Sequence, residues 1–137
     1  MSPTHATHVA ATHAFYSAFD EDPEKLAPFF TPDAVDHDGP AGAESAKGSM
    51  HARARGLHTN FPGFRREIER VSPIDASHVF VRWRITVEHA RAAYGIPPTH
   101  RRVSFHGHDV FGFRVDKIAE VWHVEELFQL LGQLRHA

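Results

Sequence analysis

The chain has 137 residues, enough for one domain with a buried core but too few for two independent folds. Its 15 basic and 17 acidic residues give a formal net charge of −2, so neither nucleic acid nor an anionic membrane surface is an expected partner. The sequence contains no cysteine, which excludes disulfides, thiolate nucleophiles and cysteine-ligated metal sites.

The first fifteen residues, MSPTHATHVAATHAF, lack both a basic segment and a long apolar run, and no eighteen consecutive apolar residues occur anywhere. We therefore expect a cytoplasmic protein without a membrane anchor, folded as a single domain over residues 1–137. Two counts are unusual, 13 histidines and 11 phenylalanines. Because histidine titrates near neutrality and phenylalanine lines apolar pockets, this composition suggests an enzyme that transfers protons.

The first half of the chain has mainly helical patterns. Residues 7–20 place an apolar stripe on good helix formers and predict a first helix. Residues 23–30 predict a second, short helix with Asp22 as its N-cap, which a proline inside it will kink or shorten. A short strand is expected around 35–37, followed by a turn-rich loop. A third helix is expected over 43–59.

The second half alternates between apolar and polar residues and predicts strands. Residues 64–71 are charged on both faces and suit a sheet edge, whereas 78–89 and 102–113 have one apolar face each. A short Arg-Val-Asp-Lys connection joins 102–113 to 118–126 as an antiparallel hairpin, and a short amphipathic tail follows. Helices first and strands afterwards predict an α+β domain whose antiparallel sheet wraps around the helices.

Five segments follow one another along the chain: VDHDGPAG at 35–42, FPGFR at 61–65, RWRITVEHARAAYGIPPTHRRVSF at 82–105, HDVFGFR at 108–114 and KIAEVWHVEELFQLLGQL at 117–134. In this order and spacing they resemble the SnoaL-like polyketide cyclase family of the nuclear-transport-factor-2-like superfamily. The resemblance implies a cystatin-like cone, in which a curved antiparallel sheet wraps around about three N-terminal helices. It also implies a small hydrophobic polyketide-like substrate, no cofactor, and a homodimer.

The resemblance assigns chemistry to three residues. Glu126 stands where the family has the Asp implicated as general base, four residues after the Trp of its Lys-Ile-x-Glu-x-Trp motif. His89 matches the family's His before the Gly-Ile-Pro-Pro turn, where it would polarise a carbonyl or protonate an enolate oxygen. His37 matches a loop His at the pocket mouth. The alternatives are an idle, exposed strand end for Glu126 and loop-fixing hydrogen bonds for His89 and His37.

Alternation along the strands sorts the remaining candidates, since side chains two positions apart share a face. Pairing across the short hairpin turn is expected to set odd positions of 102–113 beside even positions of the last strand. Phe105 and Asp109 would then share a face with Glu126, whose carboxylate would be desolvated among aromatic rings and its pKa raised. The expected substrate contacts are Tyr16, Trp83, Phe105, Asp109 and Trp122.

The same parity places the His-x-His pair, His106 and His108, on the opposite face together with His123 and Glu125. Two imidazoles on one side of a strand, completed by a third, could hold a metal. A chain this rich in histidine produces such a pair easily, however, so we expect no metal site there. The alternative uses of this histidine-rich face are a convex-side cluster or a dimer contact.

The sequence thus leads to one main hypothesis, a cofactor-independent cyclase of secondary metabolism. Acid–base catalysis in an apolar pocket would close a ring within the substrate, by an aldol-type reaction or by epoxide opening. Alternatives on the same cone are an isomerase, a dehydratase, a hydrolase or a noncatalytic protein that binds a small ligand. A metal-dependent enzyme that uses His106, His108 and His123 is a third and weaker possibility.

Overall fold

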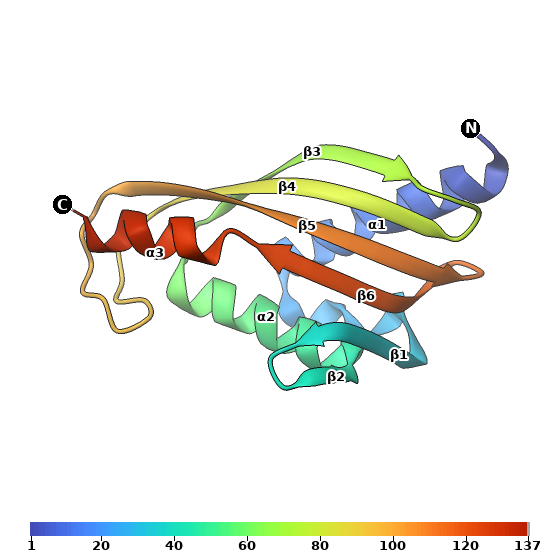
Figure 1. Cartoon of the computed structure of the whole chain (residues 1–137), viewed down its shortest axis with the longest axis horizontal. Coiled ribbons are helices and arrows are strands. Elements are labelled where there is room, and N and C mark those ends of the chain that lie inside the picture. Colours follow the sequence, from blue (N-terminus) through green and yellow to red (C-terminus); the bar gives the residue numbers. More distant parts are fainter. Residues whose placement is uncertain (137) are drawn as a thin grey trace.

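Six strands form one curved, open sheet, and two long helices pack against one of its faces (Figure 1). The computed structural model describes residues 1–136. The helices are α1 (Pro3–Glu21), α2 (Ala46–Asn60) and α3 (Leu127–Arg135), with two 3₁₀ turns, η1 (Pro23–Lys25) and η2 (Ala27–Phe29). The strands are β1 (Phe30–Gly39), β2 (Gly42–Ser45), β3 (Arg65–Pro73), β4 (His78–Glu88), β5 (Arg102–Arg114) and β6 (Lys117–Glu125). Within the described residues, no helix is both long enough and apolar enough to cross a membrane.

The strand order is β2-β1-β6-β5-β4-β3, so the last four strands form an antiparallel meander with β3 at one edge. This confirms the expected α+β cone and the edge position of the charged segment after residue 63. The pairing of β1 with β6 is parallel, which alternation of side chains along the sequence could not predict. We call the face that packs against α1 and α2 the inner face of the sheet, and the opposite one the outer face.

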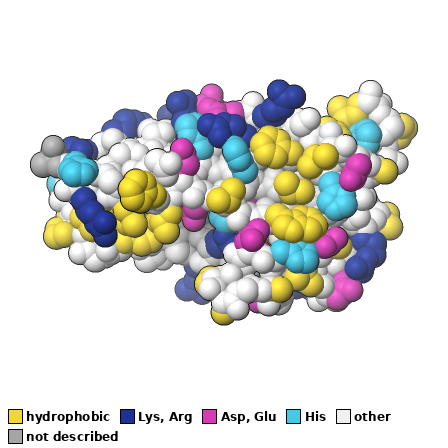
Figure 2. Space-filling view, viewed as in Figure 1, with side chains coloured by type: hydrophobic (Ala, Val, Ile, Leu, Met, Phe, Trp, Pro, Cys, Tyr) yellow, Lys and Arg dark blue, Asp and Glu magenta, His cyan; other side chains and the backbone are white. Residues whose placement is uncertain are grey.

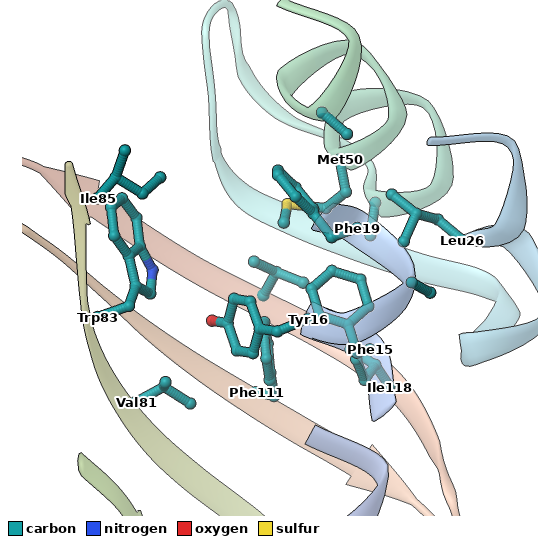
Figure 3. Packing of buried hydrophobic residues seen from close by; sticks show 14 of the residues in the cluster. Phe15, Tyr16, Phe19, Leu26, Met50, Val81, Trp83, Ile85, Phe111 and Ile118 are labelled. Atoms are coloured by element: carbon teal, nitrogen blue, oxygen red, sulfur yellow. The ribbon is translucent and has the colours of Figure 1, made fainter. Parts of the chain in front are cut away.

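The core lies between α1 and the inner face and is built largely from aromatic rings. Phe15 is fully buried, and its ring lies edge-on to Phe19, Phe30 and Phe111 at centroid distances of 6.0, 5.6 and 5.3 Å. Such edge-to-face pairs add to the free energy gained from burying the rings. Figure 3 shows how this cluster continues past Tyr16, whose hydroxyl is directed towards the strand that carries Trp83. The hydroxyl of Tyr16 therefore marks the boundary between the apolar core and a group of polar side chains.

The helix boundaries differ from the predictions for local reasons. Helix α1 begins earlier than expected, at Pro3, because the Ser2 side chain accepts a hydrogen bond from the His5 backbone N–H and caps the helix. The segment expected as one short helix forms the two 3₁₀ turns, since Pro28 supplies no backbone donor and interrupts the ladder. The third expected helix is α2, which starts three residues later than predicted.

A β-bulge near the β5–β6 turn reverses the predicted parity of the last strand. Phe113 pairs with Ile118, as the short turn requires, but Gly112 pairs with Glu120, so that Ala119 is an extra residue in β6. Beyond the bulge, odd positions of β5 face odd positions of β6, as in the pair Asp109 and His123. The prediction that even positions of β6 share the inner face was therefore wrong.

Candidate active site

A cavity of about 180 Å³ opens between the inner face of the sheet and helices α1 and α2. An apolar cavity of roughly 150 Å³ can hold a benzene molecule, so this one has room for a ring-sized group. Its walls are mainly aromatic and aliphatic, with a small number of charged side chains. The lining residues are Tyr16, Phe19, Met50, Arg53, Gly56, Leu57, Asn60, Phe61, Arg66, Trp83, Ile85, Tyr94, Phe105, Asp109, His123 and Glu125.

The cavity wall contains a buried carboxylate, Asp109 on β5, that accepts hydrogen bonds from three side chains. Trp83 Nε1 donates to Oδ2 at 2.8 Å, and the Tyr16 hydroxyl donates to the same oxygen. His123 Nδ1 donates to Oδ1 at 2.6 Å. Burial acts to raise the pKa of Asp109, but the hydrogen bonds and charge of His123, with those of Tyr16 and Trp83, hold it below its usual value. Asp109 is therefore an anion at neutral pH.

His123, on β6, is held in its protonated form by this anion. Burial acts to lower its pKa, but the hydrogen bond to Asp109, the nearby Glu125 carboxylate and the Asp109 charge outweigh burial and raise the pKa to about 9. Because a carboxylate can only accept, Nδ1 carries a proton towards Asp109. The other ring nitrogen, Nε2, is enclosed and has no hydrogen-bond partner among residues 1–136. His123 is thus a buried imidazolium with one N–H still to be satisfied.

Glu125 lies two positions further along β6 and lines the same cavity. Its Oε1 is 3.8 Å from His123 Nε2, too far for a good hydrogen bond but close enough for electrostatic attraction. The side chain is 36% exposed, so Glu125 lies at the boundary between the cavity and solvent. An acid and a carboxylate base therefore stand side by side on one strand, which is what general acid–base chemistry requires.

Trp83 reaches Asp109 because the residue opposite it in the sheet has no side chain. Trp83 pairs with Gly107, and a Cβ at Gly107 would lie only 2.0 Å from the indole Cζ2. The indole therefore lies directly over the β5 backbone, with Nε1 directed to Asp109. Gly107 is part of the site although it contributes no atom to the chemistry.

Four of the five expected substrate contacts, Tyr16, Trp83, Phe105 and Asp109, line the cavity. The fifth, Trp122, lies on the outer face, where its ring stacks on His37 at a centroid distance of 4.6 Å. His37 in turn bonds Glu120 through Nε2 at 2.8 Å. The bulge turns Trp122 outward, and His37 points outward because it alternates along β1 with the buried Asp36. Neither residue lines the cavity, which corrects the expectation for both.

Glu126 also lies outside the cavity, on the far side of the end of β6. Its carboxylate accepts from the backbone N–H of His106 at 2.7 Å and contacts the Nδ1 of the same residue at 2.8 Å. These hydrogen bonds hold the pKa of Glu126 below its usual value. The expectation of a desolvated carboxylate with a raised pKa was therefore wrong, because Glu126 precedes α3 and faces a shallow depression beside Arg82 and Gln129.

His89 is fully buried at the end of β4 but does not line the cavity. Its Nδ1 lies 3.0 Å from Thr99 Oγ1 and 3.3 Å from the Thr99 backbone nitrogen. The backbone of His89 bonds Arg101 and His100 across the loop. These contacts favour the alternative in which His89 fixes the loop, and a catalytic role for it stays an untested prediction.

The His-x-His pair lies on the outer face, as parity predicted. His106 contacts Glu69 and Glu126, and His108 Nε2 lies 2.6 Å from Arg82 Nη1. His123 does not join the pair, because the bulge turns it inward, whereas Glu125 lines both the cavity and the depression beside the pair. In the part of the chain that the structure describes, no group of three or more His, Asp or Glu is arranged to hold a metal ion.

Four charged residues of the cavity were not predicted from the sequence: His123, Glu125, Arg53 and Arg66. Simple alternation along the last strand had predicted that His123 and Glu125 lie on the outer face. The signal in the sequence was Asp109 itself, since a carboxylate on a buried face requires donors. Which residue lies opposite Asp109 depends on the bulge, which sets His123 there. Arg53 and Arg66 come from elements whose orientation towards the sheet is set by tertiary packing.

Comparison with known families matches residues 9–134 to the SnoaL-like polyketide cyclases. The chain belongs to this family. At the family level, membership supports a cyclase-type activity. No curated protein matches the sequence.

Solved structures with the same fold cover nearly the whole chain. AclR from Streptomyces galilaeus, provisionally assigned as a hydroxylase, is 25% identical over 94% of this chain and 85% of its own, with a TM-score of 0.82. A provisionally assigned SnoaL-like polyketide cyclase from Jannaschia is 17% identical over 100% and 97%, with a TM-score of 0.84. IdmH from Streptomyces antibioticus, provisionally assigned as a polyketide cyclase, is 23% identical over 92% and 96%, with a TM-score of 0.80.

Proposed function

We propose that this protein closes a ring within a small, polyketide-like substrate by general acid–base catalysis in the cavity. One observation carries the proposal: His123, held by Asp109, stands next to Glu125 in a mainly apolar wall. Membership of the cyclase family supports the same reaction class. The catalytic residues differ from those that the sequence suggested, because Glu126 lies outside the cavity.

In the proposed reaction Glu125 removes a proton from a carbon next to a carbonyl group. His123 donates through Nε2 to the carbonyl oxygen, so that the enolate forms with its charge stabilised. The enolate carbon then attacks a second carbonyl carbon of the same molecule, which forms the carbon–carbon bond of the ring. The new alkoxide takes the proton of His123, and the proton held by Glu125 returns to His123 across the 3.8 Å gap. No atom is gained or lost.

Asp109, Tyr16 and Trp83 support this chemistry without touching the substrate's reacting atoms. Asp109 keeps His123 protonated and fixes its ring, while the other two residues hold the Asp109 carboxylate in place. The apolar walls exclude water, so the enolate reacts within its own chain instead of being reprotonated by solvent. The fixed ring and the shaped cavity together favour cyclisation over side reactions.

The proposal is tested by turnover of a panel of β-keto and epoxide substrates with the wild type and single variants. We expect Glu125→Gln and His123→Asn each to lose at least roughly a hundredfold in kcat/KM, since one positioned acid or base contributes about 10²–10⁴ in rate. Glu67→Gln is the matched control, because Glu67 is an exposed β3 carboxylate that pairs with Arg84. Glu126→Gln tests the sequence-based assignment, and we expect it to retain most of the activity.

The outcomes separate the competing functions. Unchanged turnover in Glu125→Gln and His123→Asn would sink the proposed mechanism, and a loss confined to Glu126→Gln would restore the sequence-based assignment. A protein that binds the panel tightly but converts none of it, with binding unaffected by either variant, would be a noncatalytic carrier. Mass spectrometry of the products distinguishes ring closure from hydroxylation, the activity assigned to AclR, because only hydroxylation adds an oxygen atom.

A further inference from the structure

The inner wall of the cavity contains a buried cation that the proposed acid–base chemistry does not use. Arg66 reaches inward from the edge strand β3, and only 3% of its side chain is exposed. Its Cζ atom lies 4.8 Å from the ring centres of Tyr16 and Trp83 and 4.9 Å from that of Phe19. Three aromatic rings therefore surround the guanidinium. Their π faces attract a cation, but they offer no oxygen or nitrogen atom that could accept a hydrogen bond from it.

This guanidinium has more donors than the protein satisfies. Its Nε donates to both oxygens of Asp20, at 3.0 and 3.1 Å. No residue among 1–136 accepts a hydrogen bond from Nη1 or Nη2. A guanidinium carries five N–H donors, and the Nη atoms of Arg66 are not among the enclosed unpaired atoms, so they reach the open space of the cavity. The Nη end of Arg66 therefore lacks an acceptor that a ligand in the cavity can provide.

The second arginine of the cavity, Arg53 on α2, differs in this respect. Its Nη2 already donates to the Asp36 carboxylate and to the Asp38 carbonyl oxygen, both at 2.9 Å. The Asp36 side chain is fully buried, so the charge of Arg53 has a fixed partner inside the protein. Arg66 is thus the cavity arginine for which neither Nη atom has an acceptor among residues 1–136.

The geometry of the guanidinium selects the chemical class of that ligand. Rings pack around Arg66 and Asp20 occupies Nε, so the remaining approach is towards the Nη1 and Nη2 end. Two N–H groups at that end match the two oxygens of a planar carboxylate in a bidentate pair. The rest of such a ligand would lie in the apolar part of the same cavity, lined by Ile85 and Phe105.

We infer that the substrate carries a carboxylate, and that Arg66 binds it and sets the specificity of the cavity. The inference deepens the proposed function, on which it rests, because it names the substrate class of the same cavity. Arg66 is here a binding residue and takes no part in the proton transfers. An anchored carboxylate would fix one end of a flexible chain, which lowers the entropic cost of bringing its reacting carbons together.

The test compares binding of matched acids and amides to the whole protein by isothermal titration calorimetry. The probes are benzoate with benzamide, and 2-naphthoate with 2-naphthamide, which differ in charge but hardly in shape. We expect the acids to bind at least about tenfold more tightly than the amides, the range of one charge-assisted hydrogen bond. Arg66→Gln should abolish this preference, and Arg66→Lys should weaken it, because lysine keeps the charge without the bidentate fork.

Arg84→Gln is the matched control and should leave the preference unchanged, since Arg84 is an exposed arginine paired with Glu67. Equal affinities for acid and amide in the wild type, or an acid preference that survives Arg66→Gln, would overturn the inference. So would inorganic phosphate binding as tightly as benzoate. If Arg66→Gln fails to fold, an acid preference in Arg66→Lys equal to that of the wild type is the overturning result.

These measurements are independent of turnover, so the two proposals can fail separately. Turnover that depends on His123 and Glu125, in a protein with no acid preference, would keep the proposed reaction and reject Arg66 as the carboxylate anchor. An acid preference that depends on Arg66, in a protein whose His123 and Glu125 variants turn over substrate normally, would keep the anchor and reject the mechanism.

Discussion

At the scale of single residues, the site depends on how one buried charge is satisfied. Asp109 is 1% exposed, and such a carboxylate is stable only with donors around it. Tyr16, Trp83 and His123 provide three donors from three different elements. The same hydrogen bonds that stabilise Asp109 hold His123 in its charged form, so the electrostatics of folding and of the proposed catalysis are linked.

This linkage predicts how stability depends on pH. Because the pKa of His123 rises to about 9 in the folded state, its contribution is fully present below the unfolded value near 6.5 and is lost as the pH rises through 9. We expect the free energy of unfolding to fall across this window by roughly 3 kcal/mol, since one pKa unit corresponds to ~1.4 kcal/mol. Urea unfolding at a series of pH values measures the decline.

Asp109→Asn isolates the contribution of His123 from those of the other histidines. Removing the carboxylate charge should bring the pKa of His123, followed by NMR of the imidazole protons, down towards or below 6.5. The decline in the free energy of unfolding between pH 6.5 and 9 should then shrink in proportion to this change in pKa. A variant whose His123 still titrates near 9 would show that Asp109 is not the group that holds the proton.

At the scale of elements, the alternation of apolar and polar residues predicted strands β3 to β6. It also predicted which side chains point inward, as far as the bulge. The inward positions of β4 and β5 were correct, including Trp83, Phe105 and Asp109. The bulge at Ala119 could not be predicted, because alanine is small and apolar enough for either face and the turn itself favoured the simple register. Because of this one extra residue, His123 lines the cavity where Trp122 had been predicted.

The pairing of β4 with β5 makes a prediction about Gly107. Gly107→Ala would place a Cβ only 2.0 Å from the Trp83 indole, so the ring must move, and we expect its hydrogen bond to Asp109 to be lost. Overpacking of this kind costs roughly 1–3 kcal/mol. We expect lower stability in urea and altered tryptophan fluorescence. Gly132→Ala in α3 is the control, because the added methyl group would meet no side chain within 4 Å. Equal stability of the two variants would contradict the proposed close contact at Gly107.

At the scale of the whole molecule, the helices cover only one face of the sheet. Figure 2 shows that hydrophobic side chains gather over the exposed strands on the outer face, interspersed with histidines and charged groups. On this face Val124 is 62% exposed, and Trp122 and Val110 are only partly buried. An apolar region of this kind on a sheet face is commonly covered by another protein surface.

We therefore expect the homodimer that the family resemblance implies, with the outer faces of two copies in contact. Val124→Asp should convert the dimer to a monomer, because a two-fold interface repeats the buried charge in both copies. Sedimentation velocity at micromolar concentration measures the change. Val115→Asp is the matched control, since Val115 is 85% exposed at the β5–β6 turn and has a positive φ of 59° that aspartate tolerates. A wild type that sediments as a monomer, or a Val124→Asp variant that remains a dimer, would exclude this face as the interface.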